Sequence, residues 1–422
     1  PDSNAVVYRA DQDTSSVYEL YVVPMSGGAS TKLNKSLVTS GDVTDFDISP
    51  DSTRVVYLAD QDTNEIYELY AVPITGPASS GIKLNKTLVS GGNVDDVFHI
   101  SISNRVVYRA DQDVDNVWEI YMVPITGPAS NGIRLNGTLA ANRDVGTNFR
   151  ISPVTSRVIY TADQDTNGVT EIYSVSIMGG SRVKLNDPLV SGGDVSDYEI
   201  SNDGTRIVYR ADQDINDVQE IYSVSITGGT VTKLNDHLSS GDSIESFKIS
   251  PDSTTVVYRS DHERENNTHD IFRVPILGGS DLRLNHNLET LETVHDYNIL
   301  PDSSTVIFAT LDFNSSEVGL FSIPLAGGSR ILLGNSLSFE MTSDSQTVVF
   351  RSNPSGGDGK QLYANSITNQ PLDFSVNSPT SSDNGVNGDG NSRVTVTWTD
   401  SLTPNVDHYE IVAKAESAPA VT

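Results

Sequence analysis

The sequence predicts an all-β protein, an eight-bladed β-propeller of four-stranded blades followed by a linker and a partial β-sandwich-like segment. Three observations lead to this prediction. A unit of about 50 residues recurs eight times, and each unit contains four short runs of β-branched and aromatic residues. Gly, Pro, Asp, Asn or Ser bounds every run, as is typical of strands joined by tight turns.

The repeat is measured from the aromatic residue that closes each Val-Val-Tyr-like run. Successive aromatic residues lie 49, 51, 52, 49, 49, 50 and 42 residues apart. Repeats of this length with four strands each are typical of propellers, whose four-stranded sheets pack radially and leave only short edges. The aromatic residues are Tyr8, Tyr57, Tyr108, Tyr160, Tyr209, Tyr258, Phe308 and Phe350.

The second unit shows the elements in order. Its first apolar run, 45–49, precedes a Pro-Asp-Ser turn, and its second run, 53–59, leads into an Asp-Gln-Asp loop. A third run, 66–74, is followed by Thr-Gly-Pro and a short fourth run at 81–85. No stretch keeps an amphipathic helical period for three turns, so all four runs are predicted to be strands.

The repeated motifs resemble those of a known family. Ile-Ser-Pro-Asp-Ser-Thr-x-Val-Val-Tyr occurs at 48–57 and 249–258, and Glu-Ile-Tyr-x-Val-Ser followed by Gly-Gly occurs at 171–180 and 220–229. These motifs resemble the TolB-type, WD40-like (PD40) propeller repeat, which also forms the propellers of prolyl-oligopeptidase-type peptidases. The resemblance covers about residues 1–370 and implies a fold, because this blade occurs in scaffolds, receptors, lyases and peptidases alike.

The resemblance also implies that the first strand of each unit lines the central channel and that the fourth is outermost. Only seven such inner strands are present for eight blades, and the opening Pro-Asp-Ser matches the turn that follows an inner strand. We expect residues before Pro1 or the segment 372–376 to complete the first blade. The expected inner strands are 46–49, 98–101, 149–152, 198–201, 247–250, 297–300 and 339–342.

The C-terminal part differs in kind, so we divide the chain into a propeller (1–376), a flexible linker (377–392) and a final β segment (393–422). The linker is rich in Asn, Ser, Gly and Asp. The final segment resembles the first strands of a fibronectin type III-like domain. It is far shorter than the roughly 90–100 residues of such a domain, so we expect a fragment of a longer modular protein or completion by another chain.

Composition excludes several classes of function. The chain has 27 Lys and Arg against 56 Asp and Glu, a net charge of −29, and no cysteine. This excess of negative charge argues against nucleic acid and anionic membrane surfaces as partners. The absence of cysteine excludes disulfides, thiolate metal sites and cysteine nucleophiles. No run of about 18 apolar residues occurs, so no membrane insertion is expected.

An acidic loop between the second and third strands is the most informative motif. In the first five units, side chains with oxygen atoms recur at loop positions 1, 3, 5 and 9, a spacing that could wrap a hard cation such as Ca²⁺. The candidate metal ligands are Asp11, Asp13, Glu19, Asp60, Asp62, Asn64, Glu68, Asp111, Asp113, Asp115, Glu119, Asp163, Asp165, Asn167, Glu171, Asp212, Asp214, Asn216 and Glu220.

The alternative is turn chemistry. Asp and Asn would shape the loop through bonds to its backbone, while the Glu at position 9 would pair with the Arg of the preceding strand, which is Arg9, Arg109 or Arg210. Only one loop has Gly at position 6, and none has Glu at position 12, so the match to a calcium loop is partial. Units six and seven break the motif.

A second acidic set precedes the inner strands, and propeller topology predicts that it shares one face of the molecule with the acidic loops. Such a face suits cations, basic partners or simple solubility. The residues of this set are Asp42, Asp45, Asp95, Asp96, Asp144, Asp194, Asp197, Asp242 and Glu245.

Candidate chemistry is sparse. No Gly-x-Ser-x-Gly elbow, P-loop or dinucleotide motif occurs. One histidine-rich group in units six and seven could hold a transition metal or act in acid–base catalysis, although its spacings match no known ligand motif. The group consists of Asp261, His262, Glu263, His269, Asp270, His286 and His295.

We therefore expect a non-catalytic, secreted or cell-surface propeller that acts as a binding or assembly scaffold. Its units are nearly identical, whereas a catalytic propeller usually carries unusual polar residues toward its channel. Partners would be proteins or further copies that add strands to free edges, with carbohydrate as another candidate. The alternatives are an extracellular enzyme acting on a polysaccharide or peptide through units six and seven, and a TolB-like periplasmic partner protein.

Overall fold

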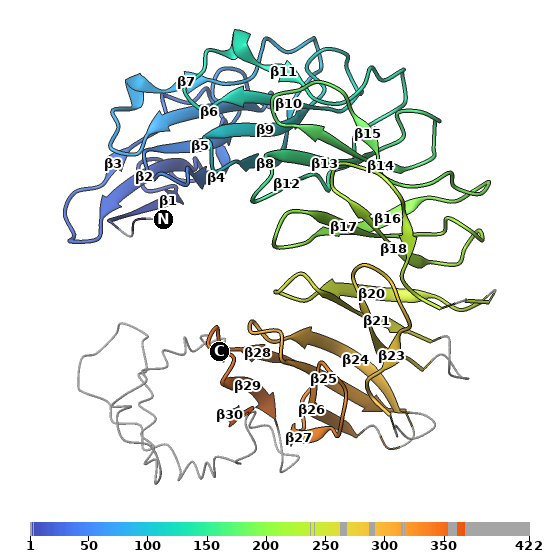
Figure 1. Cartoon of the computed structure of the whole chain (residues 1–422). Coiled ribbons are helices and arrows are strands. Elements are labelled where there is room, and N and C mark those ends of the chain that lie inside the picture. Colours follow the sequence, from blue (N-terminus) through green and yellow to red (C-terminus); the bar gives the residue numbers. More distant parts are fainter. Residues whose placement is uncertain are drawn as a thin grey trace, which may run out of the picture.

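The computed structural model describes residues 2, 4–236, 238–239, 241–261, 268–286, 292–313, 315, 317–352 and 361–367. In this part of the chain the strands form eight antiparallel sheets that follow one another round an arc (Figure 1). Each sheet is one blade, and we number the blades in chain order. The prediction of an all-β, eight-bladed propeller is confirmed. The predicted closing strand 372–376, the linker 377–392 and the segment 393–422 lie outside the described residues.

Blades two to seven have four strands each, whereas blades one and eight have three in the described residues. The strands of the first four blades are β1 Ala5–Ala10, β2 Glu19–Pro24, β3 Thr31–Lys32, β4 Val43–Ile48, β5 Arg54–Ala59, β6 Glu68–Pro73, β7 Ile82–Lys83, β8 Val94–Ile100, β9 Arg105–Ala110, β10 Glu119–Pro124, β11 Ile133–Arg134, β12 Arg150–Ile151, β13 Arg157–Ala162, β14 Glu171–Ser176 and β15 Val183–Lys184. Those of the last four are β16 Val195–Ile200, β17 Arg206–Ala211, β18 Glu220–Ser225, β19 Thr232–Lys233, β20 Ile244–Ile249, β21 Thr255–Ser260, β22 Asp270–Pro275, β23 Leu282–Arg283, β24 Glu292–Ile299, β25 Thr305–Asp312, β26 Val318–Pro324, β27 Ile331–Gly334, β28 Phe339–Met341, β29 Thr347–Ser352 and β30 Gln361–Ser366.

The chain runs through each blade from the centre of the arc to its periphery. In blade two the order is β4-β5-β6-β7, all antiparallel, and the other four-stranded blades repeat it. The first strands lie nearest the centre in Figure 1. All seven predicted inner strands are therefore confirmed. Most begin a few residues earlier than expected, because a bulge near Asp45 and its equivalents extends the pairing.

The core lies between neighbouring blades. Leu69 and Leu84 of blade two form one buried cluster with Tyr108 and Tyr121 of blade three. Within each blade, the aromatic residues of the second and third strands stack, with Tyr57 and Tyr70 at a centroid distance of 5.3 Å. Burying such rings contributes most of the stabilising free energy in a sheet protein of this kind. The aromatic residue that marks each sequence repeat is therefore a core residue that packs between neighbouring blades.

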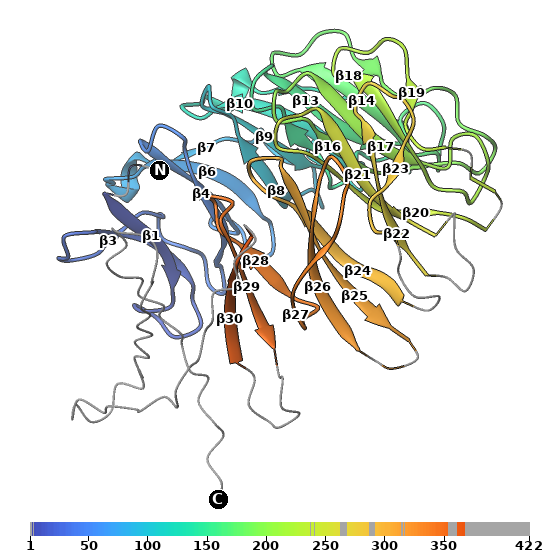
Figure 2. The same cartoon turned by 60° about the horizontal axis from the view of Figure 1, so that its bottom comes forward.

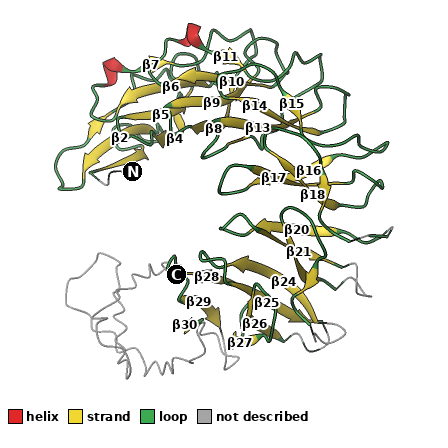
Figure 3. Ribbon diagram, in the orientation of Figure 1, coloured by secondary structure: helices red, strands yellow, loops and turns green. Residues whose placement is uncertain are grey.

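Helical structure is minimal in the described residues. Two short 3-10 helices, η1 (Ala78–Ser80) and η2 (Ala129–Asn131), follow the Gly-Pro turns of blades two and three. Elsewhere strands and loops make up the blades (Figure 3). No helix in this part of the chain is long and apolar enough to cross a membrane. The tilted view shows that successive blades pack side by side around the arc (Figure 2).

Candidate functional site

The first Asp of each acidic loop serves the backbone. In blade two, Asp60 is 3% exposed, and its Oδ1 accepts a hydrogen bond from the Asp42 amide (2.6 Å) while its Oδ2 accepts one from the Glu65 amide (2.9 Å). Equivalent bonds recur in blades three, four and five. Both oxygens accept hydrogen bonds from backbone amides, so this residue shapes the loop.

The carboxylates at loop positions 3 and 9 bind a lysine. The Nζ of Lys83 on β7 lies 2.8 Å from Asp62 and 2.6 Å from Glu68, and Glu68 is 7% exposed. Glu68 also accepts a hydrogen bond from the Tyr70 hydroxyl at 3.1 Å. An ammonium therefore already lies where a cation would have to bind. The corresponding clusters elsewhere are Asp13, Glu19 and Lys32; Glu119 and Arg134; Asp165, Glu171 and Lys184; and Asp214, Glu220 and Lys233.

The loop carboxylates therefore have protein partners, and calcium binding at these loops stays a prediction. No group of three or more His, Asp or Glu side chains in the described ranges is arranged to hold a metal ion. Among the residues expected at loop position 5, Asp115 belongs to no such group in the described ranges. The basic residue of the short fourth strand neutralises the loop instead. The sequence did not reveal this partner because it lies about 15 residues downstream in another strand.

The expected partner of the position 9 Glu is wrong. The Arg of the second strand reaches the next blade instead. Arg9 donates to the carbonyls of Val43 (3.2 Å) and Thr44 (2.5 Å), where the inner strand of blade two begins. Arg109 donates to the Val145 carbonyl (2.7 Å) in the same manner. The arginines therefore connect neighbouring blades.

The second acidic set also connects blades, and its predicted position beside the acidic loops is confirmed. Asp42, whose amide is bound by Asp60, accepts a hydrogen bond through its own Oδ1 from the Tyr18 amide of blade one (2.6 Å). Asp144 and Asp194 bind the preceding blades at Trp118 and Thr170. Much of the acidity of this face is therefore structural.

The described members of the histidine-rich group in blades six and seven form no cluster of three or more His, Asp or Glu that could hold a metal ion. Asp270 is fully buried and pairs with Arg283 at 2.8 Å, so it replaces the position 9 Glu of the other blades. His269 lies 3.7 Å from Glu245, whereas His286 and His295 are exposed. Asp261 binds the Ser243 amide (2.8 Å). His262 and Glu263 lie outside the described residues.

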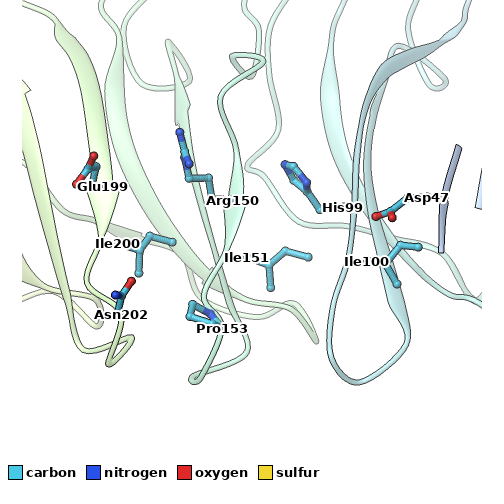
Figure 4. A pocket seen from close by; sticks show the side chains of 9 residues that line it. All are labelled: Asp47, His99, Ile100, Arg150, Ile151, Pro153, Glu199, Ile200 and Asn202. Carbon is cyan, nitrogen blue, oxygen red and sulfur yellow. The ribbon is translucent and has the colours of Figure 1, made fainter. Parts of the chain in front are cut away.

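One cavity among the described residues lies on the central channel, where sequence reasoning placed no site. It has a volume of about 560 Å³ and opens between the inner strands of blades two to five. In Figure 4 the polar side chains of Asp47, His99, Arg150 and Glu199 lie in a tier above the isoleucines. The lining residues are Asp47, His99, Ile100, Arg150, Ile151, Pro153, Glu199, Ile200 and Asn202.

The four polar side chains occupy one equivalent position, which we call the channel position. It follows the aromatic residue of each inner strand and pairs with the Val or Ile that precedes the aromatic residue of the second strand. Its occupants in blades two to eight are Asp47, His99, Arg150, Glu199, Lys248, Asn298 and Glu340.

The channel-position residues were not predicted from the sequence, because the near-identical blades were expected to carry no unusual polar residues toward the channel. That expectation is wrong at this one position. The available signal was variation: the flanking aromatic residue and the following Ile recur in most blades, while the residue between them differs in nearly every blade.

Several channel-position side chains bind the inner strand of the next blade. The His99 Nε2 lies 3.0 Å from the Phe149 carbonyl, and because a carbonyl only accepts, Nε2 carries the hydrogen. Glu199 accepts a hydrogen bond from the Ile249 amide at 2.9 Å. Burial in the channel wall lowers the pKa of His99, and the nearby Arg150 charge lowers it further. Burial raises the pKa of Glu199, against the opposing effect of the Ile249 hydrogen bond.

The Arg150 guanidinium uses few of its hydrogen-bond donors within the protein. Its Nε donates to the Asn148 side chain at 3.2 Å, and no ion pair joins Arg150 to Asp47 or Glu199 in the described part of the chain. The guanidinium therefore leaves donors in a fork geometry open to the cavity, the arrangement that recognises carboxylate or phosphate groups.

Comparisons with known proteins match these blades only at low identity. No family model and no curated protein matches the chain. A TolB structure from Agrobacterium tumefaciens is 18% identical, with a TM-score of 0.34, over 57% of this chain and 80% of the other. An oligogalacturonate lyase from Vibrio parahaemolyticus is 12% identical, with a TM-score of 0.42, over 86% and 96%. An oligogalacturonate lyase in complex with manganese is 13% identical, with a TM-score of 0.41, over 76% and 86%.

Proposed function

We propose that this chain is a non-catalytic binding module of a secreted or cell-surface protein, with its ligand site in the cavity between the inner strands of blades two to five. The observation that carries the proposal is the channel position. Blades that repeat one another in their core and loops differ there, and the residues are polar or charged in every described inner strand. A requirement common to all blades cannot explain a residue that changes from blade to blade.

The electrostatics of the cavity support a ligand. Charged groups in a concave wall lose part of their hydration, and this cost is recovered when a partner of opposite charge binds them. Asp47, Arg150 and Glu199 face the cavity without forming ion pairs with one another among the described residues. A volume of about 560 Å³ falls within the usual range of small-molecule and peptide sites.

The test is a comparison of binding profiles on peptide and glycan arrays. The channel variant carries His99→Asn and Arg150→Gln, and the matched control carries His286→Asn and Arg351→Gln, which change exposed residues of the same types outside the cavity. We expect at least one ligand class whose signal falls about tenfold or more in the channel variant but not in the control. Profiles that are the same for both variants would overturn the proposal.

Association with protein partners through strand edges is a second proposal. In the described residues β1 pairs only with β2, so the other edge of β1 presents unpaired backbone groups. Such an edge can accept a strand from another chain. Light scattering should show a concentration-dependent rise in mass, and the substitution Val7→Pro at this edge should abolish it. A constant monomer mass would exclude self-association.

A further inference from the structure

The turns beside the cavity differ from those of the other blades. In blade two, Asp51 accepts hydrogen bonds from the Ser49 hydroxyl (2.7 Å) and the Thr53 amide (3.0 Å), and these donors lower the pKa of Asp51 to about 2. Blades three and four have Ile102 and Val154 in the corresponding turns, with exposed fractions of 78% and 63%. These two turns lack the stabilising carboxylate and present apolar side chains to solvent.

The exposed Ile102 of blade three lies beside the cavity. A smaller hollow of about 90 Å³ between blades three and four is lined by Ile102, Pro153 and Ile151, and both Pro153 and Ile151 also line the main cavity. Figure 4 places Pro153 beneath the tier that contains Arg150. Exposed apolar side chains that adjoin a polar cavity are typical of a binding surface. The cavity therefore has an apolar rim at the blades that supply His99 and Arg150.

The charged tier offers both signs. Arg150 is the cation, and its only hydrogen bond to the described residues uses Nε. Glu199 and Asp47 each use one carboxylate oxygen to accept a backbone amide, from Ile249 and from Ile48, which leaves the second oxygen open toward the cavity. The site thus has one cation between two carboxylates, above an apolar floor.

Building on the proposed function, we propose that the cavity binds a short zwitterionic peptide with apolar side chains. Its carboxylate would lie on Arg150, its ammonium on Glu199 or Asp47, and its side chains over Ile102 and Pro153. A simple anion would face two carboxylates, and a simple cation would face the guanidinium. A neutral polar ligand would leave the apolar rim uncovered. Only a dipolar ligand with an apolar part matches all three features.

The experiment is isothermal titration of the full chain with four probes. Leu-Leu is the reference, Leu-Leu amide lacks the carboxylate, N-acetyl-Leu-Leu lacks the ammonium, and Gly-Gly lacks the apolar side chains. We expect each change to weaken binding about tenfold. In Arg150→Gln the acid and the amide should bind equally, and in Glu199→Gln the discrimination between free and acetylated peptide should shrink. Glu317→Gln and Arg351→Gln, at exposed sites outside the cavity, should leave the wild-type ranking unchanged.

The outcomes separate this inference from the proposed function. Unfolding midpoints of each variant establish that the blades remain intact. If Leu-Leu fails to bind, or if Arg150→Gln still discriminates acid from amide, the peptide assignment is overturned. In that case an array ligand whose signal depends on Arg150 would still support a binding site in the cavity. If no array ligand depends on Arg150, both the peptide assignment and the proposed binding site are overturned.

Discussion

The periphery and the channel of this propeller follow opposite rules. At the periphery, an acidic loop residue and a buried Glu bind the basic residue of the fourth strand in the same manner in several blades, as Asp62 and Glu68 bind Lys83. At the channel, an equivalent backbone position carries a different side chain in nearly every blade, and Arg150 and Glu199 form no ion pair with each other in the described chain.

The difference shows how to separate structural from functional residues in a repeat protein. A residue that recurs in each blade satisfies a need that each blade shares, which here is packing and charge neutralisation at the loop. A residue that varies on an unchanged backbone is free of that need, and function can select it. Recurrence made the acidic loops look like ion sites, whereas the ion pairs and amide hydrogen bonds seen there meet a structural need of each blade.

The largest effect should follow from breaking the peripheral cluster. Glu68→Ala removes the Glu68 partner of the buried Tyr70 hydroxyl and one of the two carboxylates beside Lys83, which keeps Asp62. We expect a loss of about 2–3 kcal/mol in unfolding free energy, less than for a fully buried pair because Lys83 is partly exposed. Urea denaturation measures it. Glu199→Ala at the channel is the comparison and should cost less than about 1 kcal/mol. Equal losses for the two variants would contradict the comparison.

Removing the loop carboxylate that binds backbone amides should have the next largest effect. Asp60→Ala leaves two amides without an acceptor, and we expect a loss of about 1–2 kcal/mol. Asp62→Ala in the same loop removes only a half-exposed ion pair and should cost at most about 1 kcal/mol. The reverse order in denaturation experiments would show that the ion pair, rather than the amide bonds, holds the loop.

The channel should show a smaller, pH-dependent effect. The pKa of His99 in the folded chain is lowered below the 6.5 of an unperturbed histidine. Between these two values the unfolded chain binds a proton that the folded chain does not, so the contribution of His99 to stability is complete above about pH 6.5 and is lost as the pH falls. His99→Asn should therefore lose less stability than wild type between pH 7.5 and pH 5. An NMR titration of His99 with a midpoint above 6.5 would refute the shift.

The smallest effect should be that of calcium. A site saturated at ~100 times its dissociation constant would add about 2.7 kcal/mol, which thermal unfolding would reveal. Because lysine already neutralises the loop carboxylates, we expect the same unfolding midpoint in EDTA, in millimolar calcium and in magnesium. A rise specific to calcium would restore the loops as ion sites, and Lys83→Met would then be expected to enlarge it.

Much of the fold could be predicted because its determinants are local. The alternation around Tyr57, the turn residues after Ile48 and the Asp-Gln-Asp loops mark strand ends within a few residues of sequence. Gln61 shows where this approach stops. Its side-chain oxygen accepts hydrogen bonds from the Tyr57 hydroxyl (2.9 Å) and from the Lys35 amide of the preceding blade (3.1 Å). The second contact joins residues from different repeats, which no spacing within one unit reveals.

The sequence by itself determined the number of blades, the order of strands within each blade and the face on which acidic side chains gather. These follow from the period of the repeat and from the two-residue alternation of strands. Tertiary structure decided that Glu68 binds Lys83, that Arg9 binds the next blade, and that the residues equivalent to Arg150 line one cavity. The physical reason is that the partners of a side chain depend on how strands pair within a blade and on which blades pack side by side. Both bring together residues that lie between 15 and 50 positions apart.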